Sequence, residues 1–442
     1  MSDNPPIAST PRILAASLAG TAIEFYDFFI YGTAASLVFG ELFFAAAPPS
    51  AQLLAAYASF SVAFLARPIG ALAFGHFGDR VGRKSTLIAS LLLMGVSTVA
   101  IGLVPTYADI GWPAPVLLCL LRFGQGLGLG GEWGGAALLA MENAPAAYRG
   151  RFGMFPQLGA PVGFLLANGF FLLLGLVLTP EQFLAWGWRT PFLASAALVG
   201  LGLWIRMRLT ETPVFTAALA EAAPPRVPAA TLLRHFPRET LAGTLAVVAA
   251  FAIFYLTTTF TLGYATTALG YDRRAFLGIL LAAIPLLAAG ILCSGYWSDR
   301  TDPRRVLMVG CGLAIPVGLL LAPLLSSGSL AFIWLFLAIA LFVMGLVYGP
   351  LGSWMPSLFP ARVRYTGVSV AFTVGGILGG GIAPILAQWL AIHGGLPWVG
   401  CYLSTAALIS LLALLTLGRS TLTPKNIARG GNRSVGNDSS PA

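Results

Sequence analysis

The sequence predicts an all-α integral membrane protein with twelve transmembrane helices in two six-helix, pseudo-symmetric halves. Three observations lead to this fold class: an apolar composition, twelve long apolar runs and an internal repeat. Of the 442 residues, 57% are hydrophobic and only 9% are charged, whereas soluble domains contain about 25% charged residues. So few charged side chains cannot cover the soluble domains that a chain of this length would form. The composition therefore excludes a soluble enzyme, a disordered protein and a secreted disulfide scaffold.

The apolar runs set the number of helices. A helix that crosses a bilayer needs about 20 mostly apolar residues. Runs of that length begin near residues 13, 51, 85, 115, 152, 190, 241, 275, 306, 330, 367 and 398. A membrane β-barrel would instead show segments of about 10 residues with strict alternation, and the sequence lacks them. Most loops between the twelve helices must be short.

The distribution of Lys and Arg predicts the orientation, because cytoplasmic loops are enriched in these residues. With the N-terminus inside, nearly all of them fall in inside segments, and the outside loops hold only Arg189, Arg273 and Arg274. The basic residues are scattered rather than clustered on one face, which argues against a nucleic-acid partner. We expect a monomer in the plasma (inner) membrane with both termini in the cytoplasm.

The longest predicted loop, residues 209–239, divides the chain at its midpoint. It contains the Pro- and Ala-rich stretch AEAAPPRVPAA, which is typical of a linker. We expect an N-terminal six-helix half at residues 1–208 and a C-terminal half at residues 240–418. Residues 419–442 are predicted to form a disordered cytoplasmic tail.

The two halves also repeat in sequence. GHFGDRVGRK at residues 75–84 recurs as GYWSDRTDPRR at residues 295–305, about 220 residues later. NAPAAYRG at 143–150 has a counterpart in LFPARVRYTG at 358–367. Both motifs follow the second and fourth spans of their half. Such an offset indicates two parallel repeats related about the membrane normal, with a binding site between them.

Metal and disulfide chemistry find no support in the sequence. The four cysteines lie inside apolar runs, without metal-ligand spacing, and the three histidines lie in loops or at span ends. We expect no metal and no cofactor.

Several strings in the sequence resemble the major facilitator superfamily. GHFGDRVGRK is similar to the superfamily's most specific loop motif. Four more strings resemble its metabolite:proton symporter branch, which includes shikimate, α-ketoglutarate, citrate and proline/betaine transporters: EFYDF at 24–28, RPIG at 67–70, GGEWGG at 130–135 and ETPVF at 211–215. The resemblance covers roughly residues 12–418. It implies the major facilitator fold and secondary active transport by alternating access.

The resemblance also implies a cytoplasmic latch that breaks as the two halves rock. Its predicted members are Asp79, Arg80, Arg83, Glu142 and Arg149, with the second-half copies Asp299 and Arg300. Charges at helix ends interact with one another and with the helix dipoles, so a latch at this position is physically reasonable. The alternative is that these charges only satisfy the positive-inside rule.

Ionisable residues inside spans are costly and usually functional, and we count five: Glu24, Asp27, Arg67, Arg122 and Glu132. At a rise of about 1.5 Å per residue, Asp27 in span one and Arg122 in span four come to similar depths, as do Arg67 and Glu132. Buried charges are tolerable mainly when paired. We therefore expect a transport pair, Asp27–Arg122 with Glu24 one turn away, and a more structural intramembrane pair, Arg67–Glu132. Alternatively, all five only hold helices together.

Polar and aromatic side chains in the spans are expected to complete the site, although each such residue is also common in helix packing and interfacial belts. The predicted substrate-binding residues are Arg122, Tyr26, Tyr31, Gln125, Gln157, Tyr255, Tyr348 and Trp354, with Trp133 as a further candidate. The predicted proton-coupling residues are Asp27, Glu24 and Glu132.

These features predict a transporter that takes up a small organic acid or related metabolite together with protons, driven by the proton gradient. In this hypothesis the substrate carboxylate displaces Asp27 or Glu24 from Arg122, whose planar guanidinium suits a carboxylate, and the displaced acid takes up a proton. A proton-driven efflux antiporter is the main alternative, because GAPVG at 159–163 partly resembles an antiporter motif. A membrane enzyme or a receptor without a transport cycle is a distant alternative.

Overall fold

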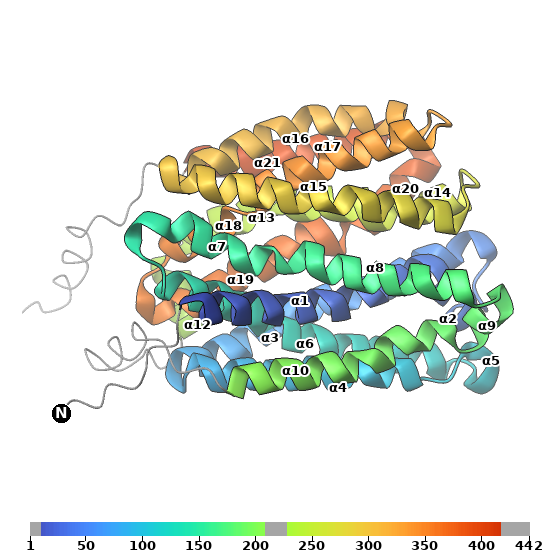
Figure 1. Cartoon of the computed structure of the whole chain (residues 1–442), viewed down its shortest axis with the longest axis horizontal. Coiled ribbons are helices and arrows are strands. Elements are labelled where there is room, and N and C mark those ends of the chain that lie inside the picture. Colours follow the sequence, from blue (N-terminus) through green and yellow to red (C-terminus); the bar gives the residue numbers. More distant parts are fainter. Residues whose placement is uncertain (1–9, 208–227, 417–442) are drawn as a thin grey trace, which may run out of the picture.

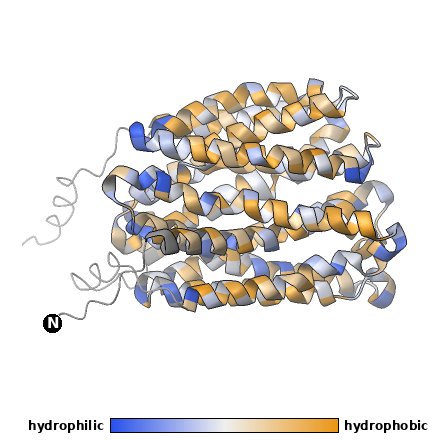
Figure 2. Cartoon of the chain, in the orientation of Figure 1, coloured by the Kyte–Doolittle hydropathy of each residue, from blue (hydrophilic) through white to orange (hydrophobic). Residues whose placement is uncertain are grey.

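The computed structural model describes residues 10–207 and 228–416. Twelve helices in these ranges are long and apolar enough to cross a membrane, and the described residues contain no β-strand. The helices run side by side in one bundle (Figure 1). Their lengths are mainly apolar and their ends are polar (Figure 2). The chain is therefore a multi-pass membrane protein with the predicted twelve spans.

The N-terminal half contains spans one to six, of which spans one and five are interrupted. The helices are α1 (Thr10–Ala34) with the π-helical segment η1 (Ala35–Phe39) and α2 (Gly40–Phe43), α3 (Pro49–Arg80), α4 (Arg83–Leu103), α6 (Pro113–Glu142), α7 (Arg149–Gln157) with α8 (Gly159–Val177), and α10 (Thr190–Met207). The connections contain the short helices α5 (Tyr107–Ile110), η2 (Ala146–Tyr148), α9 (Pro180–Ala185) and η3 (Gly187–Arg189).

The C-terminal half contains spans seven to twelve. The helices are α13 (Pro237–Tyr255) with the π-helical segment η4 (Leu256–Phe260) and α14 (Thr261–Thr267), α15 (Arg273–Arg300), α16 (Pro303–Leu325), α17 (Leu330–Tyr348) with α18 (Leu351–Trp354) and η5 (Met355–Leu358), α19 (Arg364–Gly376) with the π-helical segment η7 (Ile377–Gly381) and α20 (Ala383–Gly394), and α21 (Leu396–Thr416). The short helices α12 (Pro228–His235) and η6 (Ala361–Val363) lie outside the spans.

Local sequence explains where many of these helices begin. Proline occupies the first helical turn of α3, α6, α13 and α16, where its missing N–H costs nothing. Asp272 caps α15 by accepting a hydrogen bond from the Ala275 N–H at 2.9 Å. Between α3 and α4, Gly82 has a φ of 126°, which a side chain would disfavour. The glycine of the repeated loop motif therefore makes the tight turn.

The structure describes only the last part of the predicted linker, residues 228–239, and this part is largely helical. The predicted loop reaches residue 239, but α12 begins at Pro228 and α13 at Pro237. The Pro and Ala residues that indicate a linker also begin helices when Pro stands in the first turn. Residues 209–227 and the predicted tail at 419–442 lie outside the described residues.

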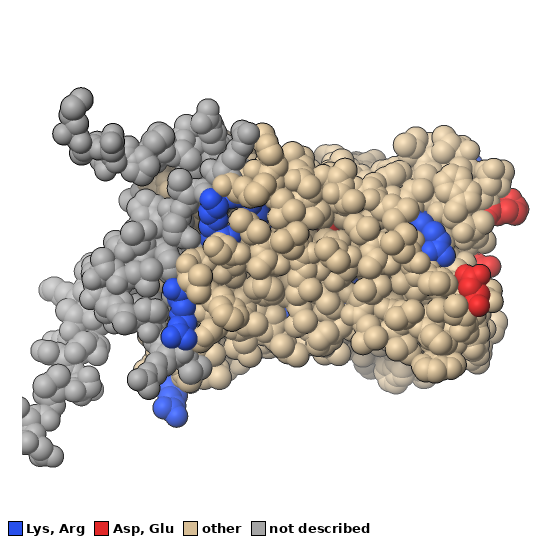
Figure 3. Space-filling model, turned by 90° about the horizontal axis from the view of Figure 1, so that it is seen from below, with Lys and Arg blue, Asp and Glu red and all other residues tan. Residues whose placement is uncertain are grey.

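Both halves meet closely at one end of the bundle, which we call the terminal face because α1 begins and α21 ends there. At this face the Cβ of an alanine at Gly78 of α3 would lie 3.0 Å from the Tyr365 ring of α19. In the symmetry-related place, a Cβ at Gly150 of α7 would lie 2.5 Å from the Gly295 carbonyl of α15. The repeated motifs thus form two equivalent crossings between the halves. Figure 3 shows basic side chains mainly at one end of the bundle, and acidic side chains with a basic side chain beside them at the other.

Candidate functional site: buried arginines and carboxyls in the N-terminal half

Arg122 of α6 is completely buried and lies in an aromatic box. Its guanidinium carbon is 4.3 Å from the ring centre of Phe28, 4.1 Å from Tyr31 and 5.0 Å from Phe60. Nη1 donates to the Gln125 side-chain carbonyl, and Nη2 has no hydrogen-bond partner. No carboxylate of the described residues lies within ion-pair distance of Arg122. Aromatic faces stabilise a desolvated cation but offer no acceptor to its Nη2.

Asp27 of α1 is also completely buried, and it does not pair with Arg122 as the sequence predicts. Its Oδ1 accepts a hydrogen bond from Ser195 of α10, and its Oδ2 has no partner. Gln125 lies between the two predicted partners, because its Nε2 donates to the Asp27 backbone carbonyl at 2.9 Å while its Oε1 accepts from Arg122. The predicted ion pair is therefore replaced by a glutamine bridge.

The second predicted pair, Arg67–Glu132, is also absent. Glu132 instead pairs with Arg206 at the end of α10, and its Oε2 accepts from Ser90 at 2.9 Å. Arg206 is only 5% exposed, although its position near a helix end predicts a cytoplasmic location. It is a sixth ionisable residue inside the spans. A long side chain that extends back into the bundle is the physical reason for the error.

Arg67 of α3 has a second aromatic environment. Its guanidinium carbon lies 4.4 Å from the Phe28 ring centre and 4.5 Å from that of Phe64. Its Nε has no hydrogen-bond partner, and no carboxylate of the residues described lies within ion-pair distance. Phe28 therefore contacts the guanidinium groups of both Arg67 and Arg122.

Glu24 lies one turn before Asp27 on α1 and is 4% exposed. Its Oε2 has no hydrogen-bond partner, and the charges that act on it are those of Arg67 and Arg206. The Arg206 side chain lies against the same helix. A Cβ added at Gly20 of α1 would lie only 3.1 Å from the Arg206 Nη2. Each of the two carboxyl groups of span one thus has one buried oxygen that is available to a proton.

The other predicted substrate-binding residues divide into three groups: residues that line a cavity, residues that hold helices together, and a pair at the junction of the two halves. Tyr255 and Tyr348 line a cavity between the halves, together with Phe25 and Phe29 of α1. This cavity holds only about 20 Å³, which is room for about one water molecule. The Tyr348 hydroxyl has no hydrogen-bond partner. The centre of the molecule is therefore nearly filled in this conformation.

The second group holds helices together. The Tyr26 hydroxyl donates to the Pro191 carbonyl at 2.8 Å, away from the cavity between the halves, and the Tyr31 hydroxyl donates to Ser59 at 2.8 Å. Trp354 is buried in α18. Tyr31 nevertheless contacts Arg122 through its ring, so it stays a candidate.

Trp133 and Gln157 lie at the junction of the two halves. The Trp133 indole donates to the Gln157 carbonyl at 3.0 Å, and its ring stacks on Phe372 of α19 at a centroid distance of 3.6 Å. The Gln157 side-chain nitrogen has no hydrogen-bond partner. This pair couples spans four and five to span eleven of the other half.

The predicted latch is present in part, with different partners. Asp299 of α15 accepts from the Gly150 N–H at 2.6 Å and pairs with Arg151 at 2.8 Å, rather than with a residue of its own half. Glu142 pairs with Arg364 at 3.6 Å. Both ion pairs join the two halves at the terminal face.

The remaining predicted latch residues are Asp79, Arg80, Arg83, Arg149 and Arg300. The side chains of Asp79 and Arg83 lie outside what the structure describes. Arg80 contacts His76 at 3.1 Å, and Arg149 lines a cavity of about 250 Å³ at the terminal face. Arg300 lies in the last turn of α15. In the described residues, no group of three or more His, Cys, Asp and Glu side chains could hold a metal ion.

A bundle of twelve spans in two repeated halves, with charged side chains buried in one half, is typical of a membrane transporter. Residues 17–384 match the family model of the Major Facilitator Superfamily, and the chain belongs to this superfamily.

Two curated relatives and one solved structure support this membership. The inner membrane metabolite transport protein YhjE of Escherichia coli is 49% identical, over 93% of this chain and 94% of the relative. The shikimate transporter of Escherichia coli is 37% identical, over 92% and 94%. The structure of the proton:xylose symporter XylE superposes with a TM-score of 0.75 at 16% identity, covering 92% of this chain and 94% of that one. The chain is a metabolite-type transporter and not an enzyme.

Proposed function

We propose that the protein takes up a small organic acid together with protons across the inner membrane, with both termini in the cytoplasm. The observation that carries this proposal is the state of four buried groups: Arg67 and Arg122 lack carboxylate partners, and Asp27 and Glu24 each have an unbonded oxygen. These two guanidinium groups lie near one aromatic ring and suit an incoming carboxylate. Each guanidinium is a planar fork of donors that can bind both oxygens of a carboxylate.

Charge balance links the carboxylate to the proton. Moving net charge across a membrane costs about 2.3 kcal/mol per elementary charge per 100 mV. If Asp27 and Glu24 are ionised in the empty protein, they balance Arg67 and Arg122. Protonation of one acid together with the arrival of one carboxylate preserves that balance. Substrate and proton then move together because either one alone leaves an uncompensated charge in the bundle.

The glutamine bridge gives the coupling a physical route. Gln125 contacts Arg122 with its carbonyl oxygen and the Asp27 backbone with its amide nitrogen. A substrate carboxylate that binds Arg122 competes with the Gln125 carbonyl. The bridge to span one then rearranges, and the environment of Asp27 changes with it.

Uptake by purified protein in proteoliposomes tests this function. The labelled panel would be shikimate, α-ketoglutarate, citrate, proline and betaine, with and without an imposed pH gradient that is acidic outside. We expect accumulation of a carboxylate-bearing compound that requires the gradient and that a protonophore abolishes. Export of cationic drugs in exchange for protons, with no acid taken up, would favour the antiporter alternative.

A substitution at Arg122 tests most directly whether this residue binds the substrate carboxylate. Arg122→Lys keeps the charge but loses the planar fork, so the apparent KM for the acid should rise at least about tenfold, which corresponds to about 1.4 kcal/mol. Arg305→Lys is the matched control, because Arg305 is exposed at the start of α16. Unchanged KM in Arg122→Lys would remove Arg122 as the carboxylate anchor.

A further inference from the structure

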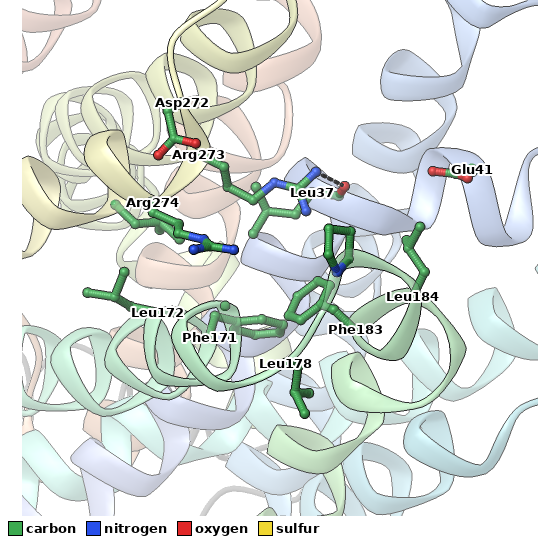
Figure 4. Close-up of a pocket in the computed structure, with 13 residues that line it drawn as sticks. Leu37, Glu41, Phe171, Leu172, Leu178, Phe183, Leu184, Asp272, Arg273 and Arg274 are labelled. Atoms are coloured by element: carbon green, nitrogen blue, oxygen red, sulfur yellow. Dashed lines mark hydrogen bonds between the residues drawn. The ribbon is translucent and has the colours of Figure 1, made fainter.

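A third cavity between the halves lies at the face opposite the terminal face. It holds about 290 Å³ and opens between α8 and α9 of the N-terminal half and the start of α15 of the C-terminal half (Figure 4). The cavity at the centre of the molecule holds about 20 Å³. In this conformation a small metabolite therefore fits the outer cavity but not the centre.

The cavity contains basic side chains where the sequence has few. Only Arg189, Arg273 and Arg274 belong to the loops and helix starts of this face, and two of them line the cavity. The Arg273 guanidinium donates to the Leu37 carbonyl at 3.1 Å, across the junction of the halves. Arg274 is exposed, has no ion-pair or hydrogen-bond partner among the described residues, and points into the cavity (Figure 4).

The acidic side chains at this cavity are largely occupied or peripheral. Asp272 caps α15 by accepting from the Ala275 N–H. Glu41 lies at the far edge of the cavity, on α2 (Figure 4), and acts electrostatically on Arg273. Arg274 is therefore the cation that remains available to an anion from outside.

The rest of the lining is apolar. Phe171, Leu172, Leu178 and Phe183 of the N-terminal half face Leu277 of α15. The wall beside Arg274 comes from α8, because the Arg274 Cγ is 4.0 Å from the Cβ position of Gly175. One available cation, Arg274, beside aromatic and aliphatic walls suits a single negative charge on a compact apolar body, because small-molecule sites typically combine apolar walls with a few placed polar groups.

We propose that this cavity is an outer binding site for a monocarboxylate with a compact apolar body, held through its carboxylate by Arg274, where the substrate waits before the centre opens. The inference rests on the proposed function for the identity of the substrate, but the site itself makes a separate prediction. Arg273 bridges to Leu37 in the π-helical segment of span one. The occupied cavity thus adjoins a contact that must break when the halves part at this face.

Binding of 4-fluorobenzoate to the full-length protein in lipid nanodiscs, followed by fluorine NMR line broadening, tests this site. The neutral 4-fluorobenzamide is the matched probe without charge. Arg274→Gln should weaken 4-fluorobenzoate binding about threefold to tenfold. Gly175→Leu keeps the charge and fills the cavity, so it should weaken binding as well. Arg305→Gln, the same charge change at the terminal face, should have no effect.

The outcomes separate this site from the central one. Binding that persists in Arg122→Gln and falls in Arg274→Gln and Gly175→Leu supports the outer site. Binding that falls in Arg122→Gln and is unchanged in Arg274→Gln overturns the outer site and leaves the proposed function standing. The outer site is overturned if the 4-fluorobenzoate line broadens equally in all variants, or if it does not broaden with the wild type. It is also overturned if 4-fluorobenzamide broadens as much as 4-fluorobenzoate. Arg274-dependent binding by a protein that shows no pH-driven uptake keeps the outer site and overturns the proposed function.

Discussion

Phe28 contacts two buried guanidinium groups, at 4.4 Å from Arg67 and 4.3 Å from Arg122. Neither arginine has a carboxylate partner among the described residues. A desolvated cation–π contact contributes about 2 kcal/mol, so this one ring offsets part of the cost of burying two charges. Phe28 therefore stabilises two buried guanidinium groups that form no ion pair with a carboxylate of the described residues.

Replacing the ring tests this role at the residue scale. Phe28→Leu should lower the free energy of unfolding of the empty protein by about 2–4 kcal/mol beyond the lost apolar packing. Phe29→Leu is the control, because Phe29 is also buried and packs on Phe164 and Phe254 instead of a guanidinium. Thermal unfolding of both variants in detergent measures the difference. Equal destabilisation would show that the two contacts with arginine contribute nothing.

The same residues show how much of the site is predictable from sequence. Residue counting predicts charged side chains inside spans one, two and four, and these side chains are buried. Direction around the helix does not follow from residue counting, because helix rotation is set by packing against the neighbours. Asp27 therefore contacts Ser195, and Gln125 occupies the place of the predicted ion pair. Arg206 escapes prediction because loop counting assigns a residue by its backbone and not by its side chain.

At the scale of helices, the clearest connection between the two halves is the contact between α15 and the start of α7. Asp299 accepts from the Gly150 N–H at 2.6 Å and pairs with Arg151 at 2.8 Å. A carboxylate at a helix N-terminus is favourable, and here the carboxylate and the helix belong to different halves. Opening the terminal face requires this contact to break.

Asp299→Asn should therefore favour the state that is open at the terminal face. Hydrogen bonds to charged groups contribute about 1.5–3 kcal/mol, so the open population should rise about tenfold. A cysteine at Ser353, which is buried and lines the terminal-face cavity, would react faster with a maleimide in detergent, in a variant without the native cysteines.

The control for this experiment is Asp302→Asn. Asp302 caps α16 through the Arg304 N–H at 2.9 Å, inside one half. Its loss costs a helix cap without separating the halves. Equal labelling rates in wild type and Asp299→Asn, or the same acceleration in Asp302→Asn, would contradict the latch.

The spans themselves were predictable, whereas their irregularities were not. Predicted span starts such as 51, 115 and 330 agree with Ala51, Pro113 and Leu330, because apolar length alone determines them. The π-helical segments η1 and η4 occupy equivalent places in spans one and seven. A π-helical turn changes the register of backbone hydrogen bonds and leaves no mark in composition, so periodicity does not reveal it.

At the scale of the whole molecule, the conformation is closed at the centre and joined at both ends. The terminal face is joined by Asp299–Arg151 and Glu142–Arg364, and the opposite face by the Tyr57 hydroxyl, which donates to the Thr259 carbonyl at 3.0 Å. Alternating access requires one set of contacts to break while the other holds. The repeat found in the sequence supplies two equivalent crossings between the halves at the terminal face, and both must separate when that face opens.

The central claim is that a carboxyl of span one carries the proton that is coupled to the substrate carboxylate. Asp27→Asn and Glu24→Gln each fix a neutral side chain of nearly the same shape. Exchange of external for internal substrate and accumulation driven by a pH gradient, measured in proteoliposomes for both variants and the double variant, test the claim most directly. We predict that one of the two single variants retains exchange and loses accumulation, and that the double variant loses accumulation. Full gradient-driven accumulation in all three would contradict the account.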